Sequence, residues 1–399
     1  MQNLVVLGAT GTVGRNTLDV VRRHPDKLRV LALTANRDAR ALAGLCAEFQ
    51  PRYAVLCDES AAAEFQASGV NTELLCGARS VAEIAAHPDA RQVMSAIVGA
   101  AGLLPTLAAV RAGKRVLIAN KEPLVMAGAL LIAEARKSGA EIIPIDSEHN
   151  AIFQCLPAGF RCGEKPQGVR KLVLTASGGP FRETPLAQLA QVTPQQAVRH
   201  PNWVMGRKIS VDSATMMNKG LELIEAAALY RLPQEQLDVV IHPESVIHSL
   251  VEYVDGSMLA QLGQPDMRVP IAHALAYPER WDSGVGGLDL AALGRFRFEA
   301  PDELRFPCLR LARQALREGG IAPNVLNAAN EIAVEAFLGG HDAHPFTSIA
   351  SMIESALDAA QGAGLPAGND LDSILAVDGW TRRWLGAGSA SRSGAAAHA

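Results

Sequence analysis

Short apolar runs alternate with amphipathic stretches along the first third of the chain. The runs lie at residues 4–7, 29–33, 53–56, 93–98 and 115–119, and small or polar residues follow them. Between several of the runs, apolar positions recur with the 3.6-residue period of a helix. Repeated alternation of strand and helix favours a parallel sheet. The pattern therefore predicts an α/β fold whose first domain covers residues 1–146.

The hydrophobic pattern changes beyond residue 146. Further strands are predicted at 171–175, 239–242, 246–254 and 258–262, with Asp255-Gly256 as the turn between the last two. These strands indicate a second α/β domain over residues 147–276. Residues 277–306 are rich in Gly, Pro and Arg without a sustained period, as in a connecting segment.

Helical periodicity returns near the C-terminus. It covers residues 308–318, 324–338, 347–360 and 371–385. We predict a small helical bundle over residues 307–385. Residues 386–399 consist mainly of Gly, Ala and Ser with no apolar pattern, and we predict a disordered tail there.

Charge and cysteine usage narrow the class of protein. The chain of 399 residues has 37 Lys and Arg against 41 Asp and Glu, so no overall field attracts nucleic acid or an anionic membrane. Its six cysteines include no C-x-x-C pair, which argues against a disulfide framework and a thiolate metal cluster. The first predicted strand begins at residue 4, so we expect no leader segment, and the sequence contains no apolar run of about twenty residues. We expect a cytoplasmic protein with no nucleic-acid or membrane partner.

Three glycines follow the first predicted strand and open a helix. Gly8, Gly11 and Gly14 have the spacing that allows a tight turn, close approach of backbone N–H groups to a phosphate, and close packing of helix on strand. The form G-x-x-G-x-x-G is a variant of the usual dinucleotide fingerprint. A Rossmann-like nucleotide site is favoured, and a tight turn without a ligand is the alternative.

The end of the second strand bears on the choice of nucleotide. NAD enzymes tend to carry an acid there for the ribose hydroxyl, whereas this chain first offers Asn36 and Arg37. A guanidinium suits a 2′-phosphate, so NADP is preferred over NAD. Asp38 opposes this preference unless its carboxylate turns away from the phosphate.

Two carboxylates end the apolar run 142–145. On an extended backbone residues i and i+2 point the same way, so Asp146 and Glu148 are expected to converge on one cation while Ser147 faces elsewhere. All-oxygen ligation suits Mg²⁺ or Mn²⁺ better than Zn²⁺. The alternative is that the two acids cap a helix predicted over 149–156. These residues alone leave both interpretations open.

Other polar groups also allow two interpretations. Lys121 follows the strand 115–119 and is either a ligand contact or solvent-exposed. Ser177 with two glycines forms either an anion-binding nest or an ordinary turn. The loop that contains His200 and Trp203 is either a mobile lid near 195–207 or a loop anchored by one core tryptophan.

A single helix is predicted from Ser213 onward. Its spacing places Asn218, Lys219 and Glu222 on one face, where a phosphate clamp and a third metal carboxylate are one interpretation. A solvated Lys and Glu pair is the other. His242 has no matching ligand set and is expected to be structural, as is His248.

Together these motifs resemble one family, the 1-deoxy-D-xylulose 5-phosphate reductoisomerases. The resemblance runs from about residue 1 through the C-terminal helices, and its most specific segments are 8–14, 119–122, 146–154, 177–181, 200–222 and 241–245. It implies a homodimeric, NADPH-dependent and metal-dependent enzyme of isoprenoid biosynthesis. Such an enzyme rearranges a linear ketose phosphate and reduces it to 2-C-methyl-D-erythritol 4-phosphate.

The resemblance also implies roles for residues of this chain. The implied ligands of the metal, Mg²⁺ or Mn²⁺, are Asp146, Glu148 and Glu222. These three residues, with Lys121 and His200, are the implied catalytic residues. The implied substrate contacts are Lys121, Ser147, Glu148, Ser177, His200, Trp203, Ser213, Asn218, Lys219 and Glu222. The implied cofactor contacts are Thr10, Gly11, Thr12, Val13, Asn36, Arg37, Asp38, Asn120, Glu122 and Gly206.

Departures from the family pattern are few. Ala9, Thr12 and Val13 replace commoner serines and isoleucine, and Pro123 replaces a serine. Asp38 stands where asparagine is usual and bears on the preference for NADPH over NADH. Two rivals remain: an NADP-dependent dehydrogenase of a phosphorylated aldehyde, which needs no convergent carboxylates, and a non-catalytic NADP sensor.

Overall fold

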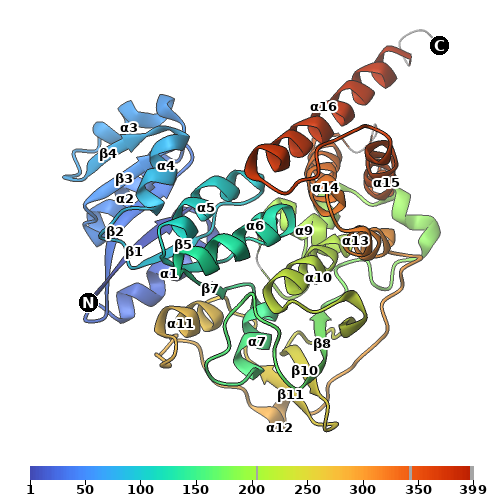
Figure 1. Cartoon of the computed structure of the whole chain (residues 1–399), viewed down its shortest axis with the longest axis horizontal. Helices are drawn as coiled ribbons and strands as arrows, with labels where there is room; N and C mark the ends of the chain where they lie inside the picture. The colour runs from blue at the N-terminus through green and yellow to red at the C-terminus, as the bar shows by residue number, and fades with distance from the viewer. Residues whose placement is uncertain (204, 341–343, 396–399) are drawn as a thin grey trace. The chain divides into compact units, whose positions relative to one another are not determined.

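The computed structural model describes residues 1–203, 205–340 and 344–395 (Figure 1). The chain forms two compact units, each built from separate segments. The first contains residues 1–123, 131–166 and 259–293, and the second contains 124–130, 167–258 and 294–399. The division differs from the sequence prediction, because residues 147–166 and 259–293 group with the nucleotide-binding domain predicted from the sequence. The predicted helical bundle groups with the second α/β region.

A parallel sheet forms the centre of the first unit. In the described part of the chain it has seven strands, in the order β4-β3-β2-β1-β5-β6-β7. Their bounds are Gln2–Leu7, Leu28–Ala35, Tyr53–Leu56, Glu73–Cys76, Gln92–Ser95, Arg115–Ile118 and Glu141–Pro144 for β1 to β7. The order reverses between β1 and β5, so their carboxyl ends border a crevice of the kind that binds dinucleotides. The predicted Rossmann-like sheet is confirmed.

Helices cover this sheet. They are α1 (Thr12–Arg23), α2 (Ala39–Phe49), α3 (Ala62–Gln66), α4 (Gly77–Ala85), α5 (Leu103–Arg111), α7 (Ser147–Cys155) and α11 (Arg268–Ala276), with short 3₁₀ turns at Glu59–Ala61 and Ala100–Gly102. Helix α6 (Glu122–Ser138) is divided between the units, because residues 124–130 count with the second. Helix α11 packs beside α1 although about 250 residues separate them. Ile271 and Leu275 of α11 complete the apolar core formed by Leu4 and Val6 of β1 and Leu18 of α1.

Two glycines of the β1–α1 turn are required by close backbone contacts. Gly8 has a φ of +78°, and a Cβ there would lie 2.7 Å from the Ala96 carbonyl oxygen at the end of β5. A Cβ on Gly14 would lie 2.4 Å from the Gly8 carbonyl oxygen. Helix α1 therefore begins in direct contact with the turn, as the glycine spacing predicts.

A second, mixed sheet has the described strands β8 (Val169–Ala176), β9 (Leu237–Ile241), β10 (Ile247–Tyr253) and β11 (Met258–Leu262), in the order β11-β10-β8-β9. Strand β11 counts with the first unit from residue 259 onward, whereas β8 to β10 lie in the second unit. Strand β8 pairs parallel with β9 and antiparallel with β10. Leu172 and Leu174 of β8 are buried at alternate positions, so one face of the sheet packs against the rest of this unit.

The helices of the second unit include the predicted bundle. They are α8 (Pro194–Ala197), α9 (Arg207–Ala214), α10 (Met217–Tyr230), α13 (Pro307–Glu318), α14 (Ala322–Gly339), α15 (Ser348–Gln361) and α16 (Leu371–Ala395), with 3₁₀ turns at Leu186–Gln191 and Gln234–Gln236. The short α12 (Leu290–Leu293), in the predicted linker, belongs to the first unit. Helices α10 and α13 are so close that a Cβ on Gly220 would lie 2.4 Å from the Ala312 Cβ. This contact explains why the bundle is not a separate unit.

The C-terminal segment differs from its prediction. Helix α16 continues to Ala395, whereas we predicted no structure from residue 386 onward. Alanine has the highest helix propensity, so an alanine-rich segment that follows an established helix can extend it. Residues 396–399 lie outside the described part of the chain. Among the described helices, none is long and apolar enough to cross a membrane.

The glycine contacts lead to a test by substitution. We expect Gly14→Ala to lower the free energy of unfolding by about 3 kcal/mol, because the added methyl group meets backbone atoms that cannot move aside. Gly44→Ala is the matched control: Gly44 lies exposed within α2 with nothing near its Cβ position, so alanine should be neutral or stabilise by up to about 1 kcal/mol. Denaturant unfolding followed by circular dichroism measures both. Equal stability of the two variants would contradict the assigned role of Gly14.

Candidate functional site

The β1–α1 turn of the first unit offers backbone donors at the sheet crevice. Gly11 is the N-cap of α1, and Gly11 and Thr12 are exposed while Thr10 and Val13 are half-buried. A helix N-terminus with exposed N–H groups favours a phosphate. The predicted contacts from Thr10 to Val13 thus lie where a dinucleotide phosphate is expected.

The Asp38 side chain caps the helix that follows it, α2. Its Oδ1 accepts a hydrogen bond from the Ala41 backbone N–H at 3.0 Å, which caps α2. Asn36 and Arg37 precede it at the carboxyl end of β2, and both are exposed. The Asp38 carboxylate is therefore stabilised by the helix terminus, and the conflict with a 2′-phosphate on Arg37 is weaker than the sequence suggested.

The segment after β6 is buried. Asn120, Lys121 and Glu122 all lie out of solvent, so the interpretation of Lys121 as solvent-exposed is wrong. The Lys121 Nζ lies 2.8 Å from the Asp146 Oδ2, at the end of the adjacent strand β7. The Asn120 Nδ2 is buried and has no hydrogen-bond partner among the described residues. It is a donor that a cofactor amide or hydroxyl group would satisfy.

Asp146 and Glu148 do not have the predicted extended geometry. Strand β7 ends at Pro144, Asp146 is the N-cap of α7, and Glu148 lies in its first turn. The Asp146 side chain makes no capping hydrogen bond, so capping does not explain it either. The two residues nevertheless each place a carboxylate oxygen within 4.8 Å of the other. The prediction of their convergence is confirmed, although a helix start and not a strand brings it about.

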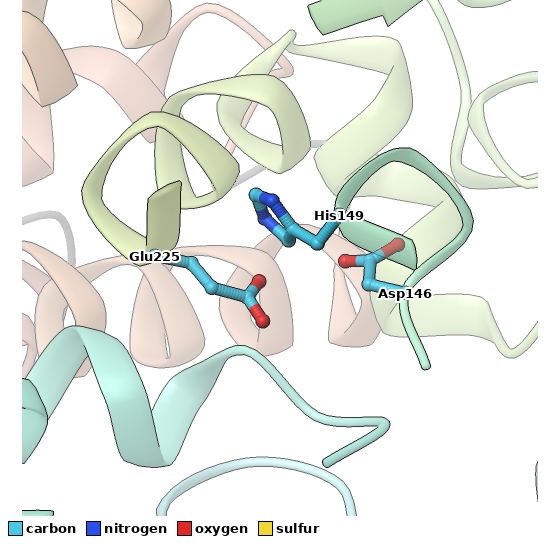
Figure 2. Close-up of side chains that lie close together, drawn as sticks. All are labelled: Asp146, His149 and Glu225. Atoms are coloured by element: carbon cyan, nitrogen blue, oxygen red, sulfur yellow. The ribbon is translucent and has the colours of Figure 1, made fainter. Parts of the chain in front are cut away.

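The donor set in this unit fits a hard divalent ion. Asp146 and Glu148 offer oxygens, which Mg²⁺ and Mn²⁺ prefer. Ser147 does not face elsewhere, since its Oγ donates to the Glu148 Oε2 at 2.5 Å. His149 was not predicted as a site residue. It is fully buried on the same turn of α7 and offers a ring nitrogen within 4.8 Å of an Asp146 oxygen (Figure 2).

In the second unit, two predicted phosphate contacts lie beside each other. Ser177 follows β8, and Gly178 and Gly179 continue the chain with φ values of +83° and +67°. A Cβ on Gly179 would lie 2.6 Å from the Ser213 carbonyl oxygen, so only glycine permits this approach. The Ser177 loop thereby lies against the end of α9, where Ser213 is located.

Hydrogen bonds fix the tautomer of His200. Its Nδ1 accepts from the backbone N–H groups of Asn202 at 3.1 Å and Trp203 at 2.9 Å. A neutral ring then carries its proton on Nε2, which donates to the Ser177 Oγ at 2.9 Å. Asn202 in turn donates to the Pro243 carbonyl and the Ser245 hydroxyl, each at 2.8 Å. Val204, within the predicted lid, lies outside the described residues.

The helix predicted from Ser213 onward is broken. Helix α9 ends at Ala214 and α10 begins at Met217, and between them Met216 has a φ of +62°. A buried methionine in the left-handed region is strained, and such strain is concentrated at functional sites. The sequence carries no glycine or proline at this break, so it could not be predicted.

The polar face of α10 is buried, contrary to the interpretation as a solvated pair. Lys219 is 3% exposed and Glu222 is 0% exposed. Asn218 Nδ2 and Lys219 Nζ donate to the two oxygens of Glu222. The prediction that these three share one face is confirmed. The buried Glu225, one turn further along α10, was not predicted (Figure 2).

Hydrogen bonds define the surroundings of one more histidine, His242, and one more acid, Asp212. The ring of His242 bonds the Arg297 carbonyl through Nδ1 at 3.0 Å and stacks on Phe298, which confirms its structural role. Asp212 of α9, which was not predicted, is buried with the Lys208 Nζ at 2.8 Å and the Asn330 Nδ2 at 2.8 Å. Gly206 is the exposed N-cap of α9. Only the three-dimensional arrangement shows that Asp212 and Asn330 are partners.

Comparison with known proteins covers most of the chain. The 1-deoxy-D-xylulose 5-phosphate reductoisomerase family model matches residues 4–128. The C-terminal domain models of the same family match residues 142–230 and 262–384. The matched segments include the β1–α1 turn, the carboxylates of α7 and the polar face of α10.

Relatives and solved structures agree with these matches. Reductoisomerases of this name from Ectopseudomonas mendocina and Nitrosospira multiformis are 58% and 57% identical, over 97% and 96% of this chain and 98% of each relative. A crystal structure of DOX-P reductoisomerase with NADPH, fosmidomycin and magnesium is similar with a TM-score of 0.92 and 49% identity, covering 98% of both chains. The Zymomonas mobilis enzyme in complex with NADPH has a TM-score of 0.88 and 47% identity, over 97% of this chain and 99% of its own. Because the family models together match most of the chain and full-length relatives are more than half identical to it, this chain belongs to the 1-deoxy-D-xylulose 5-phosphate reductoisomerase family.

Proposed function

We propose that this chain isomerises 1-deoxy-D-xylulose 5-phosphate and reduces the resulting branched aldehyde with NADPH, giving 2-C-methyl-D-erythritol 4-phosphate for isoprenoid biosynthesis. The proposal rests on one observation: the Asp146 carboxylate, which makes no capping hydrogen bond, lies beside Glu148 and the buried Lys121. A simple dehydrogenase of a phosphorylated aldehyde has no need of such convergent carboxylates. The isomerisation needs them, because a cation must hold two adjacent substrate oxygens while a C–C bond breaks and reforms.

Asp146 and Glu148 would hold the divalent ion in the first unit, and Glu222 of the second unit would complete its protein ligands. When bound, Mg²⁺ or Mn²⁺ polarises the substrate ketone and stabilises the negative charge that develops on it. Ser147 holds the Glu148 carboxylate in place. Lys121 supplies a buried ammonium group that can donate to a substrate hydroxyl.

The second unit supplies the phosphate site. We assign it to Ser177, Ser213, Asn218 and Lys219, of which Lys219 brings the positive charge that a phosphate dianion requires. His200 carries its N–H at Nε2, because its Nδ1 is bonded to the backbone, and this N–H donates to the Ser177 hydroxyl of the phosphate site. The segment near 195–207, with His200 and Trp203, would close over the substrate and keep water from the reacting carbon atoms.

The first unit supplies most of the NADPH site. We assign phosphate contacts to residues Thr10 to Val13 at the α1 N-terminus, the 2′-phosphate to Asn36 and Arg37, and further contacts to Asn120 and Glu122. Gly206, which belongs to the second unit, is assigned a contact from the family resemblance alone. The sheet order supports this site, because the β1–α1 turn lies at the topological switch point. The unsatisfied Asn120 Nδ2 supports it independently.

An assay of NADPH oxidation tests the proposed function. With 1-deoxy-D-xylulose 5-phosphate and Mn²⁺ or Mg²⁺ we expect NADPH consumption and formation of the branched polyol phosphate, and excess chelator should abolish both. Full activity in chelator would favour a simple dehydrogenase. Binding of NADPH without any turnover would favour a non-catalytic sensor.

The same assay tests the third metal ligand. Glu222→Gln should lower kcat/KM by about 100-fold or more, since an amide binds a divalent ion more weakly than a carboxylate, while NADPH affinity stays the same. Glu235→Gln is the matched control, because Glu235 is exposed in the same unit. Turnover of Glu222→Gln equal to that of the control would exclude the ligand role.

Nucleotide preference depends on Arg37 in this assignment. Arg37→Ala should raise the KM for NADPH by about 10–100-fold and leave the KM for NADH unchanged, because a charge-assisted bond to the 2′-phosphate is lost. The control is Arg40→Ala, a nearby arginine whose side chain is 90% exposed. An equal effect on both nucleotides would contradict a 2′-phosphate contact.

We also propose that the chain forms a homodimer through β11. This edge strand leaves Met258 and Leu259 each 49% exposed and Leu262 36% exposed. An apolar edge strand favours pairing with a second copy by a two-fold axis. Sedimentation velocity should give a dimer for the natural chain and a larger monomer fraction for Leu259→Lys. A monomer at all concentrations would contradict the proposal.

The cytoplasm is the proposed location. Burial raises the pKa of the Cys46 and Cys308 thiols to about 12, so both behave as packed apolar groups. Thiols of this kind are usual in reducing compartments. Cell fractionation is the test, and activity confined to another fraction would contradict it.

A further inference from the structure

A buried amide ties the start of α7 to the rest of the first unit. Asn150 lies one turn after Asp146 on α7 and is fully buried. Its Nδ2 donates to the Pro144 carbonyl oxygen at 2.8 Å, where β7 ends. The same Nδ2 lies 3.1 Å from the His273 Nδ1 on α11. Asn150 thus spans the strand end and the helix start between which Asp146 is placed.

Every polar atom of the Asn150 side chain is used. The two hydrogens of Nδ2 go to Pro144 and His273, and the Oδ1 accepts from the Gln154 Nε2 at 2.8 Å. Gln154 is held in turn by the Arg280 Nη1 at 2.8 Å. Because all of its bonds are directional and buried, the amide has a single orientation, which also assigns its oxygen and nitrogen.

The arrangement requires a neutral His273 with its proton on Nε2, since Nδ1 must accept from Asn150. The surroundings favour that state. Burial, with the nearby Arg280 charge, lowers the pKa of His273 to about 4. The ring also packs against Phe153 of α7 and Tyr277, with centroids 6.1 and 5.9 Å away. His273 therefore acts as a fixed acceptor on α11.

We propose that Asn150 and His273 are positioning residues for the divalent metal: they hold the β7–α7 turn so that Asp146 and Glu148 converge. The inference rests on the proposed function, because it takes these carboxylates as metal ligands. Neither residue touches the metal or substrate in this assignment. Loss of the Asn150 bonds would free the Pro144 carbonyl and let the turn relax, which separates the carboxylates before it affects the nucleotide site.

Metal affinity is the property that distinguishes positioning from a general structural role. We expect Asn150→Ala and His273→Leu to weaken Mn²⁺ binding to the full-length chain by about 10–100-fold, as measured by electron paramagnetic resonance of the free ion. His273→Gln should recover most of the affinity, because the glutamine oxygen can accept from Asn150. NADPH affinity should be unchanged in all three, and kcat at saturating Mn²⁺ should fall only a few-fold. His87→Gln is the matched control, because His87 lies in the loop between α4 and β5 of the same unit, where its ring contacts Tyr53 and Asp89.

The outcomes separate this inference from the proposed function. Mn²⁺ affinity in Asn150→Ala and His273→Leu equal to that of the control would overturn the positioning role while leaving the metal site intact. If both leucine and glutamine at position 273 weaken Mn²⁺ and NADPH binding alike, the residue is merely structural and the inference is overturned. Absence of Mn²⁺ binding by the natural chain would overturn the metal site itself and this inference with it. Should Asn150→Ala fail to fold, the Mn²⁺ affinities of His273→Leu and His273→Gln still test the positioning role, and equal affinities would overturn it.

Discussion

The burial of charged side chains is the constraint on which the site depends. Lys121 and Asp146 lie at the carboxyl ends of neighbouring strands, are largely removed from water and are 2.8 Å apart. A charge without a partner in such surroundings costs several kcal/mol, so each group requires the other in the absence of a ligand. In the proposed function a divalent cation would pair with Asp146 and the substrate with Lys121, so ligand contacts would replace this internal ion pair.

Buried charges are also paired in the second unit, on α9 and α10. Glu222 accepts from both Asn218 and Lys219, and Asp212 accepts from Lys208 and Asn330. Four helices, α9, α10, α13 and α14, pack around these groups and keep water away. Helix α14 belongs to the C-terminal bundle, so the bundle does more than cover an apolar face: its Asn330 satisfies a buried acid next to Ser213.

Local signals in the sequence predicted the elements well, and long-range contacts account for what they missed. Strands β3 and β11 have the bounds that the apolar runs indicated, and the glycine turn has the expected contacts. The convergence of Asp146 and Glu148 was predicted for the wrong reason, since period-two alternation was applied to residues two and four positions past the end of β7. The break at Met216 leaves no local signal, because the sequence has no glycine or proline there. The pairing of Asn150 with His273 leaves none either, because it joins residues 123 positions apart. The sequence prediction treated each domain as one continuous segment, whereas the two compact units are each built from separate segments.

The placement of α11 has a consequence for synthesis of the chain. Ile271 and Leu275 belong to the same buried cluster as Leu4 and Val6, although more than 260 residues lie between them. The N-terminal sheet can begin to form early on the ribosome, but its core stays open until residue 276 has emerged. During that interval, the strands β8 to β10 and the helices α9 and α10 are translated while the first unit is incomplete. The first unit therefore cannot complete its folding before much of the second unit has been translated. Any fragment that ends before α11 exposes apolar surface that the complete chain covers.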